Sequence, residues 1–346
     1  MFGYLQDQKN QKVYRSRTGA PKTTTRHPAK NTPPERQGQT GSRPYQGAYA
    51  DTNAMLGGSL IHHGPFNDRA YLFRLDSADL PGIAGRLLAL ARCRGYSRVF
   101  ARIPAPACGH FISSGYHPRA RIPGLYRGEV DGFYMAAYRD PLQSGWQDGI
   151  DDVLAVAEEK GRRSSESPVL EPGIACTPAT PADAPALAAI YRKVFATYPV
   201  PVHDPAYLVR EMHRDLHCFC IRDGKKIAAI ASAAVDPEGQ FAEMTGFATL
   251  PEYRGRGFSS HLLRWMEAKM RSIGIKTAFA IVRARSYPAS IIFARAGYTH
   301  AGTVPGCVNI CGSLEDMNVW YRLLDDRMAA PPRGISGPAG DARGKE

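Results

Sequence analysis

The pattern of hydrophobic and polar positions changes period repeatedly from residue 174 onward. Short apolar runs, and runs that alternate apolar with polar residues, are typical of strands, whereas apolar stripes with a 3.6-residue period are typical of helices. Two of the strand-like runs flank Asp223-Gly224-Lys225, which predicts a hairpin. The sequence therefore predicts strands at 174–177, 216–222, 227–235, 241–250, 277–282, 299–303 and 317–323.

Amphipathic stretches between these strands predict helices. Thr180-Pro-Ala-Asp183 has the form of a capping box that opens one helix, and Tyr198-Pro-Val-Pro201 ends it because two prolines cannot continue a helix. A second apolar stripe extends from Leu262 to Ile273, and a third helix is expected at 289–296. The alternation of strands and helices predicts an α+β (mixed α/β) fold.

The strand at 241–250 leads directly into a turn rich in arginine and glycine, which opens the next helix. In Arg254-Gly-Arg-Gly-Phe-Ser259, main-chain N–H groups lie at the positive end of that helix, where they can hold a pyrophosphate. Gly255 and Gly257 permit torsions that a side chain forbids, and Arg254 and Arg256 add positive charge. The turn has neither the G-x-x-x-x-G-K-[ST] pattern nor the spacing of a dinucleotide fingerprint. It therefore predicts an anion site of another kind.

The pattern Arg-x-x-Gly-x-Gly/Ala after a strand resembles the acetyl-CoA signature of the GNAT N-acetyltransferase superfamily, with Ser259 in place of the usual Gly/Ala. The order of the predicted elements and the ending Phe293-x-x-x-Gly297-Tyr298 are also similar to that family. The resemblance implies a catalytic GNAT domain at 173–325 that uses acetyl-CoA as co-substrate. It implies that the coenzyme is held at Phe247, Ala248, Thr249, Arg254, Gly255, Arg256, Gly257, Phe258 and Ser259.

Separated blocks within residues 55–325 are similar to the β-lysine N-acetyltransferases. They include Asn67–Tyr71, Ile122–Tyr126, Ala242–Gly255 and Met317–Tyr321. This resemblance implies acetyl transfer to the ε-amine of a small diamino acid, β-lysine, which gives a neutralised compatible solute (osmolyte). It also implies a lysine 2,3-aminomutase as the upstream enzyme. Two alternatives stay open: a GNAT enzyme for another small amine, such as a polyamine or an antibiotic, and a non-catalytic protein that binds nucleic acid through basic tails.

Glu243 is the candidate general base. It lies eleven residues before Arg254, a spacing at which several GNAT members carry a catalytic glutamate. Period two along the strand places Glu243, Thr245 and Phe247 on one face. A lysine amine has a pKa near 10.4 and a glutamate near 4.3, so direct abstraction is uphill by about 6 units and implies a water relay or a lowered amine pKa. Pairing with a substrate ammonium and an exposed strand-end carboxylate are the alternatives.

The general acid departs from the family pattern. Many GNAT enzymes carry a tyrosine where this chain has Phe293, which has no proton to donate. A thiol with a pKa of about 8.5 is a fair leaving group without help, so this change is compatible with activity. Tyr287 and Tyr298 are the remaining candidates, and a buried core position is the alternative for Tyr298.

The last predicted hairpin carries polar residues that suit a diamino acid, which needs anionic partners for its second ammonium and donors for its carboxylate. Asn309, Glu315 and Asn318 are the candidate substrate residues. A solvated, charged loop explains them equally well. The neighbouring Arg283 and Arg285 end a predicted strand near the same cleft.

The first half of the chain repeats part of the second. Phe111-x-x-x-Gly115-Tyr116 followed by Pro123-Gly124 matches Phe293-x-x-x-Gly297-Tyr298 followed by Pro305-Gly306 at the same spacing. Residues 55–140 are therefore expected to form a degenerate GNAT-like N-terminal lobe. This lobe lacks the phosphate turn, so we expect it to bind no coenzyme and to pack on the catalytic lobe. A linker with a short helix at 150–160 is expected over 141–172.

Charge is concentrated at the ends of the chain. Residues 1–50 contain nine Lys/Arg and two Asp/Glu, and residues 327–346 contain four and two, so only +3 of the net charge of +12 belongs to the rest. We expect disordered tails at 1–54 and 326–346, no nucleic-acid partner and no membrane segment. The chain has no secretory signal pattern, which predicts a cytoplasmic protein.

The seven cysteines do not have metal-site spacing. Cys218-x-Cys220 and Cys307-x-x-x-Cys311 are not C-x-x-C knuckles, and adjacent histidines on a strand, His62 and His63, point to opposite faces. We therefore expect reduced, mostly buried thiols and no metal.

Overall fold

The computed structural model describes residues 51–140, 145, 148–162 and 169–324. The predicted tails lie outside these ranges, apart from residues 51–54, where the first strand begins. Within the described part of the chain, no helix has the length and apolar character needed to cross a membrane.

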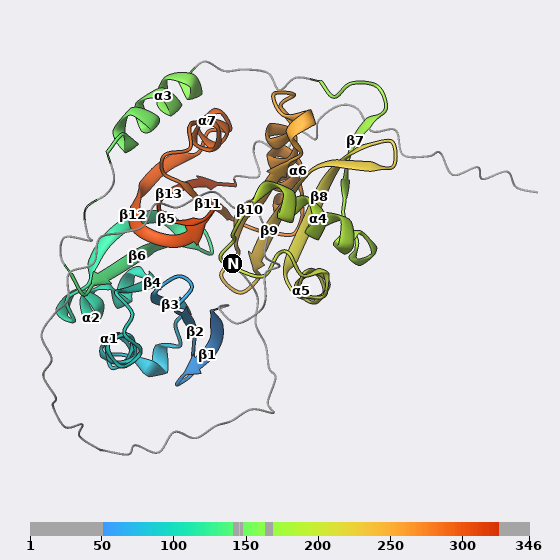
Figure 1. Ribbon diagram of the computed structural model, residues 1–346. Helices are drawn as coiled ribbons and strands as arrows, with labels where there is room; N and C mark the ends of the chain where they lie inside the picture. Colours follow the sequence, from blue (N-terminus) through green and yellow to red (C-terminus); the bar gives the residue numbers. More distant parts are fainter. Residues whose placement is uncertain (1–50, 141–144, 146–147, 163–168, 325–346) are drawn as a thin grey trace, which may run out of the picture. The chain divides into compact units, whose positions relative to one another are not determined.

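The strands of the described residues form one thirteen-stranded sheet (Figure 1) in the order β1-β2-β3-β4-β6-β5-β12-β13-β11-β10-β9-β8-β7. We call residues 52–138 the N-terminal lobe and residues 174–323 the C-terminal lobe. The strands are β1 (Thr52–Leu56), β2 (Ser59–Gly64), β3 (Arg69–Arg74), β4 (Arg98–Pro104), β5 (His117–Tyr126), β6 (Val130–Tyr138), β7 (Ile174–Pro178), β8 (Leu216–Asp223), β9 (Lys226–Asp236), β10 (Phe241–Thr249), β11 (Thr277–Arg283), β12 (Thr299–Ile310) and β13 (Ser313–Leu323). The helices are α1 (Ile83–Arg94), α2 (Cys108–Ser113), α3 (Ile150–Arg162), α4 (Ala184–Val194), α5 (Pro205–Met212), α6 (Phe258–Ser272) and α7 (Tyr287–Arg295).

Helices cover both faces of the sheet in the C-terminal lobe. Because side chains alternate along a strand, Ile221 and Ala231 pack against Leu262 of α6 on one face. Cys220 and Ile230 pack with α4 and α5 on the other face. The apolar cores on both faces fix the position of β10 and of the turn that follows it.

The two lobes join where β5 pairs with β12, through Ala120 and Gly302. A side chain at Gly302 would place its Cβ 2.1 Å from the main-chain oxygen of Arg119, and Gly302 has a φ of 142°. Only glycine therefore permits this close approach. Ala120 and Gly302 are equivalent positions, three residues before Pro123 and Pro305. Antiparallel pairing of equivalent residues relates the lobes by a local two-fold axis.

The repeated sequence pattern has matching geometry in both lobes. The rings of Phe111 and Tyr116 meet edge to face at 5.1 Å and 75°, and those of Phe293 and Tyr298 meet at 5.0 Å and 73°. Strand pairing matches as well. The parallel pair β3–β4 corresponds to the parallel pair β10–β11, and the antiparallel pair β4–β6 corresponds to the antiparallel pair β11–β13. The N-terminal lobe thus has the same strand order as the C-terminal lobe from β8 to β13.

The helix expected between the lobes is present as α3 and packs against α7. A Cβ at Gly161 would lie 3.0 Å from the main-chain oxygen of Ala294. The small residue therefore allows the two helices to come close together.

Candidate active site

The sheet opens between β10 and β11 beyond Glu243. β10 pairs with β11 only from Phe241 to Glu243, whereas its pairing with β9 continues to Thr249. A bulge between Thr245 and Ala248, with Gly246 at a φ of 65°, bends the strand. The main chain at Phe247–Thr249 therefore has no described pairing with β11.

The arginine- and glycine-rich turn follows this bend. Gly255 has a φ of 80°, and Gly257, the N-cap of α6, has a φ of 73°. No side chain caps α6, and its first turn, which contains Phe258 and Ser259, holds no acidic residue. The positive end of α6 is thus compatible with an anion.

The two arginines of the turn differ in their surroundings. Arg256 donates from Nη2 to Glu171 at 2.6 Å, and its guanidinium lies over the rings of Tyr253 and Phe258. Arg254 is exposed to solvent. Glu171 compensates the charge of Arg256, whereas Arg254 is an exposed cation beside the positive end of α6.

Glu243 lies in a cavity on the side of the bend that faces β12 and β13. Glu243 is only 5% exposed. The cavity has a volume of about 40 Å³. A water needs about 10–15 Å³, so this space holds about three waters. We call it the Glu243 cavity. Its polar and aromatic lining includes Arg69, Tyr71, Tyr198, Glu243 and Thr245.

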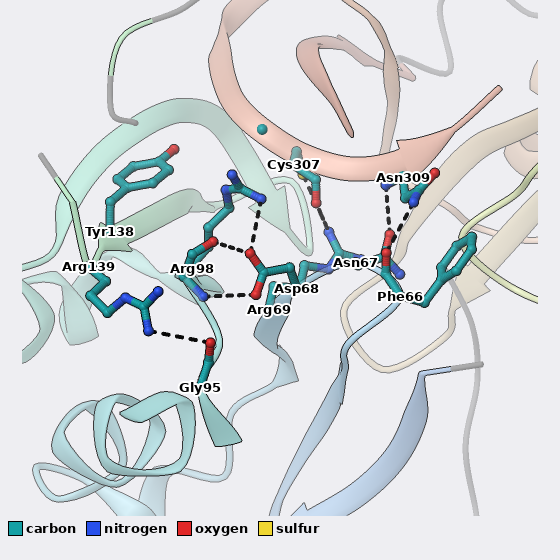
Figure 2. Close-up of polar contacts among 12 residues, drawn as sticks. Phe66, Asn67, Asp68, Arg69, Gly95, Arg98, Tyr138, Arg139, Cys307 and Asn309 are labelled. Carbon is teal, nitrogen blue, oxygen red and sulfur yellow. Dashed lines mark hydrogen bonds and ion pairs between the residues drawn. The ribbon is translucent and has the colours of Figure 1, made fainter. Parts of the chain in front are cut away.

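Arg69 enters the Glu243 cavity from the N-terminal lobe. It is fully buried, and Nη1 donates to the main-chain oxygen of Cys307, as Figure 2 shows. Its Nε and Nη2 atoms have no hydrogen-bond partner among the described residues. A buried guanidinium with spare donors is suited to bind a carboxylate.

Neighbouring contacts hold Arg69 in place. The Asn67 side chain accepts a hydrogen bond of 2.8 Å from the Asn309 N–H, and Asp68 pairs with Arg98 at 3.7 Å (Figure 2). The start of β3 is therefore fixed on both sides of Arg69, which reduces the entropy that binding would remove.

Two tyrosine hydroxyls complete the Glu243 cavity. Burial raises the pKa of Tyr198 to about 12, and its hydroxyl lies 3.3 Å from Thr245 Oγ1. Burial also raises the pKa of Tyr71 to about 12. Both groups are neutral hydrogen-bond donors near neutral pH. From the sequence, Tyr198 was predicted only to end a helix, and Arg69 and Tyr71 were not predicted to line a cavity.

The candidates for the general acid lie elsewhere. Tyr298 is a core residue that packs on Phe293, and burial raises its pKa well above the usual value. Tyr287 is 43% exposed at the start of α7. Phe293 contacts Phe247 edge to face at 5.7 Å, so an apolar ring lies beside the bent part of β10.

The three residues suggested for substrate binding do not line the Glu243 cavity. Asn309 donates from Nδ2 to the main-chain oxygen of Phe66 at 3.2 Å. Glu315 pairs with Arg283 at 3.1 Å, and Asn318 accepts a hydrogen bond of 2.7 Å from Thr303. Their side chains therefore hold the β12–β13 hairpin and its contact with the N-terminal lobe.

In the described part of the chain, no group of three or more His, Cys, Asp or Glu is arranged to hold a metal ion. His62 is buried, and His63 Nδ1 lies 3.0 Å from the hydroxyl of Tyr96. All seven cysteines are free thiols, and Cys176, Cys218, Cys220 and Cys307 are buried.

Residues 187–298 match the family model described as "Acetyltransferase (GNAT) family". The chain is 31% identical over 269 residues to the β-lysine N(6)-acetyltransferase of Methanococcus maripaludis. The aligned region covers 77% of this chain and 97% of that protein. It is also 31% identical over 263 residues to the β-lysine N(6)-acetyltransferase of Methanosarcina mazei, covering 70% and 97%. Over 138 residues it is 36% identical to the N-acetyltransferase YodP of Bacillus subtilis, covering 40% of this chain and 50% of that protein.

Among solved structures, the chain is similar to a spermidine N-acetyltransferase, SpeG, from Vibrio cholerae, with 14% identity and a TM-score of 0.39 over 44% of this chain and 95% of that one. It is also similar to the ribosomal L7/L12 α-N-protein acetyltransferase RimL in complex with coenzyme A. That match has 18% identity and a TM-score of 0.39 over 45% of this chain and 97% of that one.

Proposed function

Because the chain belongs to the acetyltransferase (GNAT) family, we propose that it transfers the acetyl group of acetyl-CoA to the ε-amine of a small diamino acid, β-lysine. The observation that carries the proposal is that Glu243 and Arg69 line one buried cavity. A carboxylate and a guanidinium in one cavity suit an acceptor that has both an amine and a carboxylate. The printed names of two relatives supply the choice of β-lysine.

The coenzyme is proposed to bind along the bend and the turn. The N–H groups of Gly255, Gly257 and the first turn of α6, together with Arg254, would hold the pyrophosphate. The main chain of Phe247–Thr249, which has no described pairing with β11, would bind the pantetheine arm and the acetyl oxygen. These residues supply binding and orientation, and acetyl-CoA supplies the activated acyl group.

Glu243 is proposed to take the proton that the amine loses as it attacks the thioester. The pKa gap of about 6 units between a lysine amine and a glutamate makes direct transfer unfavourable. Because the Glu243 cavity has room for about three waters, a water can relay the proton. The cavity is smaller than a diamino acid, so some of the side chains that line it must move to admit the acceptor.

Arg69 is proposed to bind the carboxylate of the acceptor through its Nε and Nη2 donors. Spermidine has no carboxylate and would leave these buried donors unsatisfied, which opposes binding. The contact thus selects amino acids over polyamines. Since acetylation removes the positive charge of the ε-amine, the product is a neutral compatible solute, and a lysine 2,3-aminomutase is the proposed upstream enzyme.

A thiol-release assay with acetyl-CoA tests this function. We expect the highest kcat/KM with β-lysine, lower values with L-lysine and L-ornithine, and the lowest with spermidine. Equal values for spermidine and β-lysine would reject the role of Arg69 in specificity. Calorimetric titration with acetyl-CoA in the absence of acceptor is the parallel check, and a lack of binding would reject the function itself.

A further inference from the structure

Strand register assigns equivalent positions in the two lobes. The parallel pair β3–β4 matches β10–β11, and the hairpin β5–β6 matches β12–β13. The repeated glycines Gly95 and Gly274 and the repeated prolines Pro123 and Pro305 align the residue numbers of the two lobes. The equivalent pairs are Arg69 and Phe241, Tyr71 and Glu243, Arg102 and Ile281, and Tyr126 and Val308.

A second cavity lies in the N-terminal lobe at the place that matches the Glu243 cavity. Arg102 and Tyr126 line it, and the residues at the equivalent positions, Ile281 and Val308, line the Glu243 cavity. Each cavity is also lined by one residue from the opposite lobe. Arg69, the first residue of β3, lines the Glu243 cavity, and Phe241, the first residue of β10, lines the second cavity. The local two-fold axis therefore relates the two cavities as well as the two sheets. We call the second one the Arg102 cavity.

The Arg102 cavity is the larger of the two, with a volume of about 290 Å³. This volume is close to the lower end of the ~300–1,000 Å³ that small-molecule pockets occupy. Residues of both lobes line this space, and several of them, including Glu129, Val130 and Glu238, are exposed, so the cavity is open to solvent.

Arg102 gives this space a buried positive charge. The residue is 6% exposed, and its guanidinium lies over the ring of Phe241 at 4.7 Å. Nη2 donates to the main-chain oxygen of Phe73 at 3.2 Å, but Nε has no hydrogen-bond partner among the described residues. An arginine stays protonated when buried, so an anionic group in the cavity would stabilise it.

Acidic residues also line the cavity. Glu129 and Glu238 are exposed to solvent, whereas Asp236 is partly buried and interacts electrostatically with Arg102. Arg74 and Arg127 also line the cavity. The lining therefore combines a buried guanidinium with exposed groups of both signs, and Glu129 and Glu238 are the carboxylates that a cation can reach.

We propose that the Arg102 cavity binds a small zwitterionic amino acid, with its carboxylate at Arg102 and its ammonium at the exposed carboxylates. Phe73, Tyr126 and Phe241 supply apolar surface for the aliphatic part of the ligand. This site is distinct from the acceptor site, and the proposal does not depend on acetyl transfer.

The Arg102 cavity binds the amino acid without acetylating it. Tyr71 stands at the position equivalent to Glu243, so the N-terminal lobe has no carboxylate there. Before α1, where the C-terminal lobe has its arginine and glycine turn, Asp79 accepts hydrogen bonds from Ser59 and Arg86. The segment Asp79–Gly82 has no arginine, and Pro81 has no N–H to donate to a pyrophosphate.

Calorimetry of the full chain with L-lysine as the probe tests the proposal. We expect two sites per chain in the wild type. Arg102→Met should weaken one of them at least tenfold, whereas Arg69→Met should weaken the other. Val130→Trp is the second variant, because Val130 is 39% exposed at the mouth and a larger side chain there blocks entry without altering the core.

The outcomes separate the site from the alternatives. A single site that Arg69→Met removes, and that neither Arg102→Met nor Val130→Trp changes, would overturn the proposal. The proposal would also be overturned if L-lysine, L-leucine and L-glutamate all failed to bind at this cavity. It would be overturned as well if inorganic phosphate bound there and none of the three amino acids did. Thiol release is measured in parallel, so a failure of the acetyl-transfer function is seen independently of the site count.

Discussion

Arg69 in β3 donates a hydrogen bond from Nη1 to the main-chain oxygen of Cys307 in β12, 238 positions further along the chain. The bond aims a guanidinium of the N-terminal lobe into the cavity that contains Glu243. The N-terminal lobe therefore contributes to the candidate active site directly and does more than cover the C-terminal lobe.

Replacing Arg69 by methionine should raise the KM for β-lysine by about 10–100-fold, because a charge-assisted hydrogen bond contributes about 1.5–3 kcal/mol. The KM for 1,5-diaminopentane, which has no carboxylate, should not rise. Arg69→Lys should restore part of the affinity for β-lysine. Arg92→Met, at an exposed position of α1, is the control. A similar rise of KM for both substrates would indicate a structural role only.

Glu243→Gln should lower kcat by about 10²–10⁴-fold, the range for loss of a general base. Acetyl-CoA affinity, measured by calorimetry, should stay unchanged. Glu158→Gln on the exposed face of α3 is the matched control. Full turnover of Glu243→Gln at neutral pH would show that Glu243 only pairs with the substrate ammonium or supports the strand.

Two glycine substitutions should have opposite effects. Gly255 has a φ of 80°, so alanine there is strained by about 1–2 kcal/mol although no atom lies within 4 Å of the added Cβ. We expect weaker acetyl-CoA binding and a lower Tm for Gly255→Ala. Gly85 lies within α1 in open space, and Gly85→Ala should raise stability by about 0.5–1 kcal/mol. Unchanged coenzyme affinity in Gly255→Ala would argue against the turn as the phosphate site.

His62 should make the fold less stable in acid. Burial, with smaller contributions from Arg69 and His63, lowers the pKa of His62 to about 3, whereas the unfolded chain has a value near 6.5. The unfolded state therefore binds more protons as the pH falls from 6.5 toward 3, and the free energy of unfolding drops by up to about 1.4 kcal/mol per pH unit.

Urea unfolding between pH 4 and pH 7 measures this contribution as the difference between the wild type and His62→Gln. The difference should shrink as the pH falls. The exposed His110 supplies the control variant, His110→Gln. A pH-independent difference would show that His62 does not stay neutral in the fold.

Local patterns were sufficient to predict most elements of the C-terminal lobe. Strands expected at 174–177, 216–222 and 241–250 correspond to β7, β8 and β10, because their apolar alternation matches the two covered faces of the sheet. The last hairpin is longer than expected. β12 continues to Ile310 through register shifts at its glycine and proline, a tertiary effect that periodicity does not encode. The helix α5 was not predicted from its short pattern.

Only part of the candidate site could be predicted from local sequence. Glu243 and the glycine turn lie on consecutive elements, so spacing in the sequence was enough to connect them. Arg69 reaches the cavity only because β5 and β12 pair, and nothing local to β3 indicates that contact. The available signal was the arginine that precedes the apolar run Ala70–Phe73 of β3, inside the block Asn67–Tyr71.

The pairing of Ala120 with Gly302 also limits which fragments of the protein can be produced separately. A fragment that starts at residue 173 would keep the coenzyme turn but would lose Arg69 and Tyr71. It would also leave β12 as an uncovered edge strand, and such edges pair with other chains and aggregate. Although its two lobes share one strand order, the protein must be expressed, trimmed and engineered as a single unit.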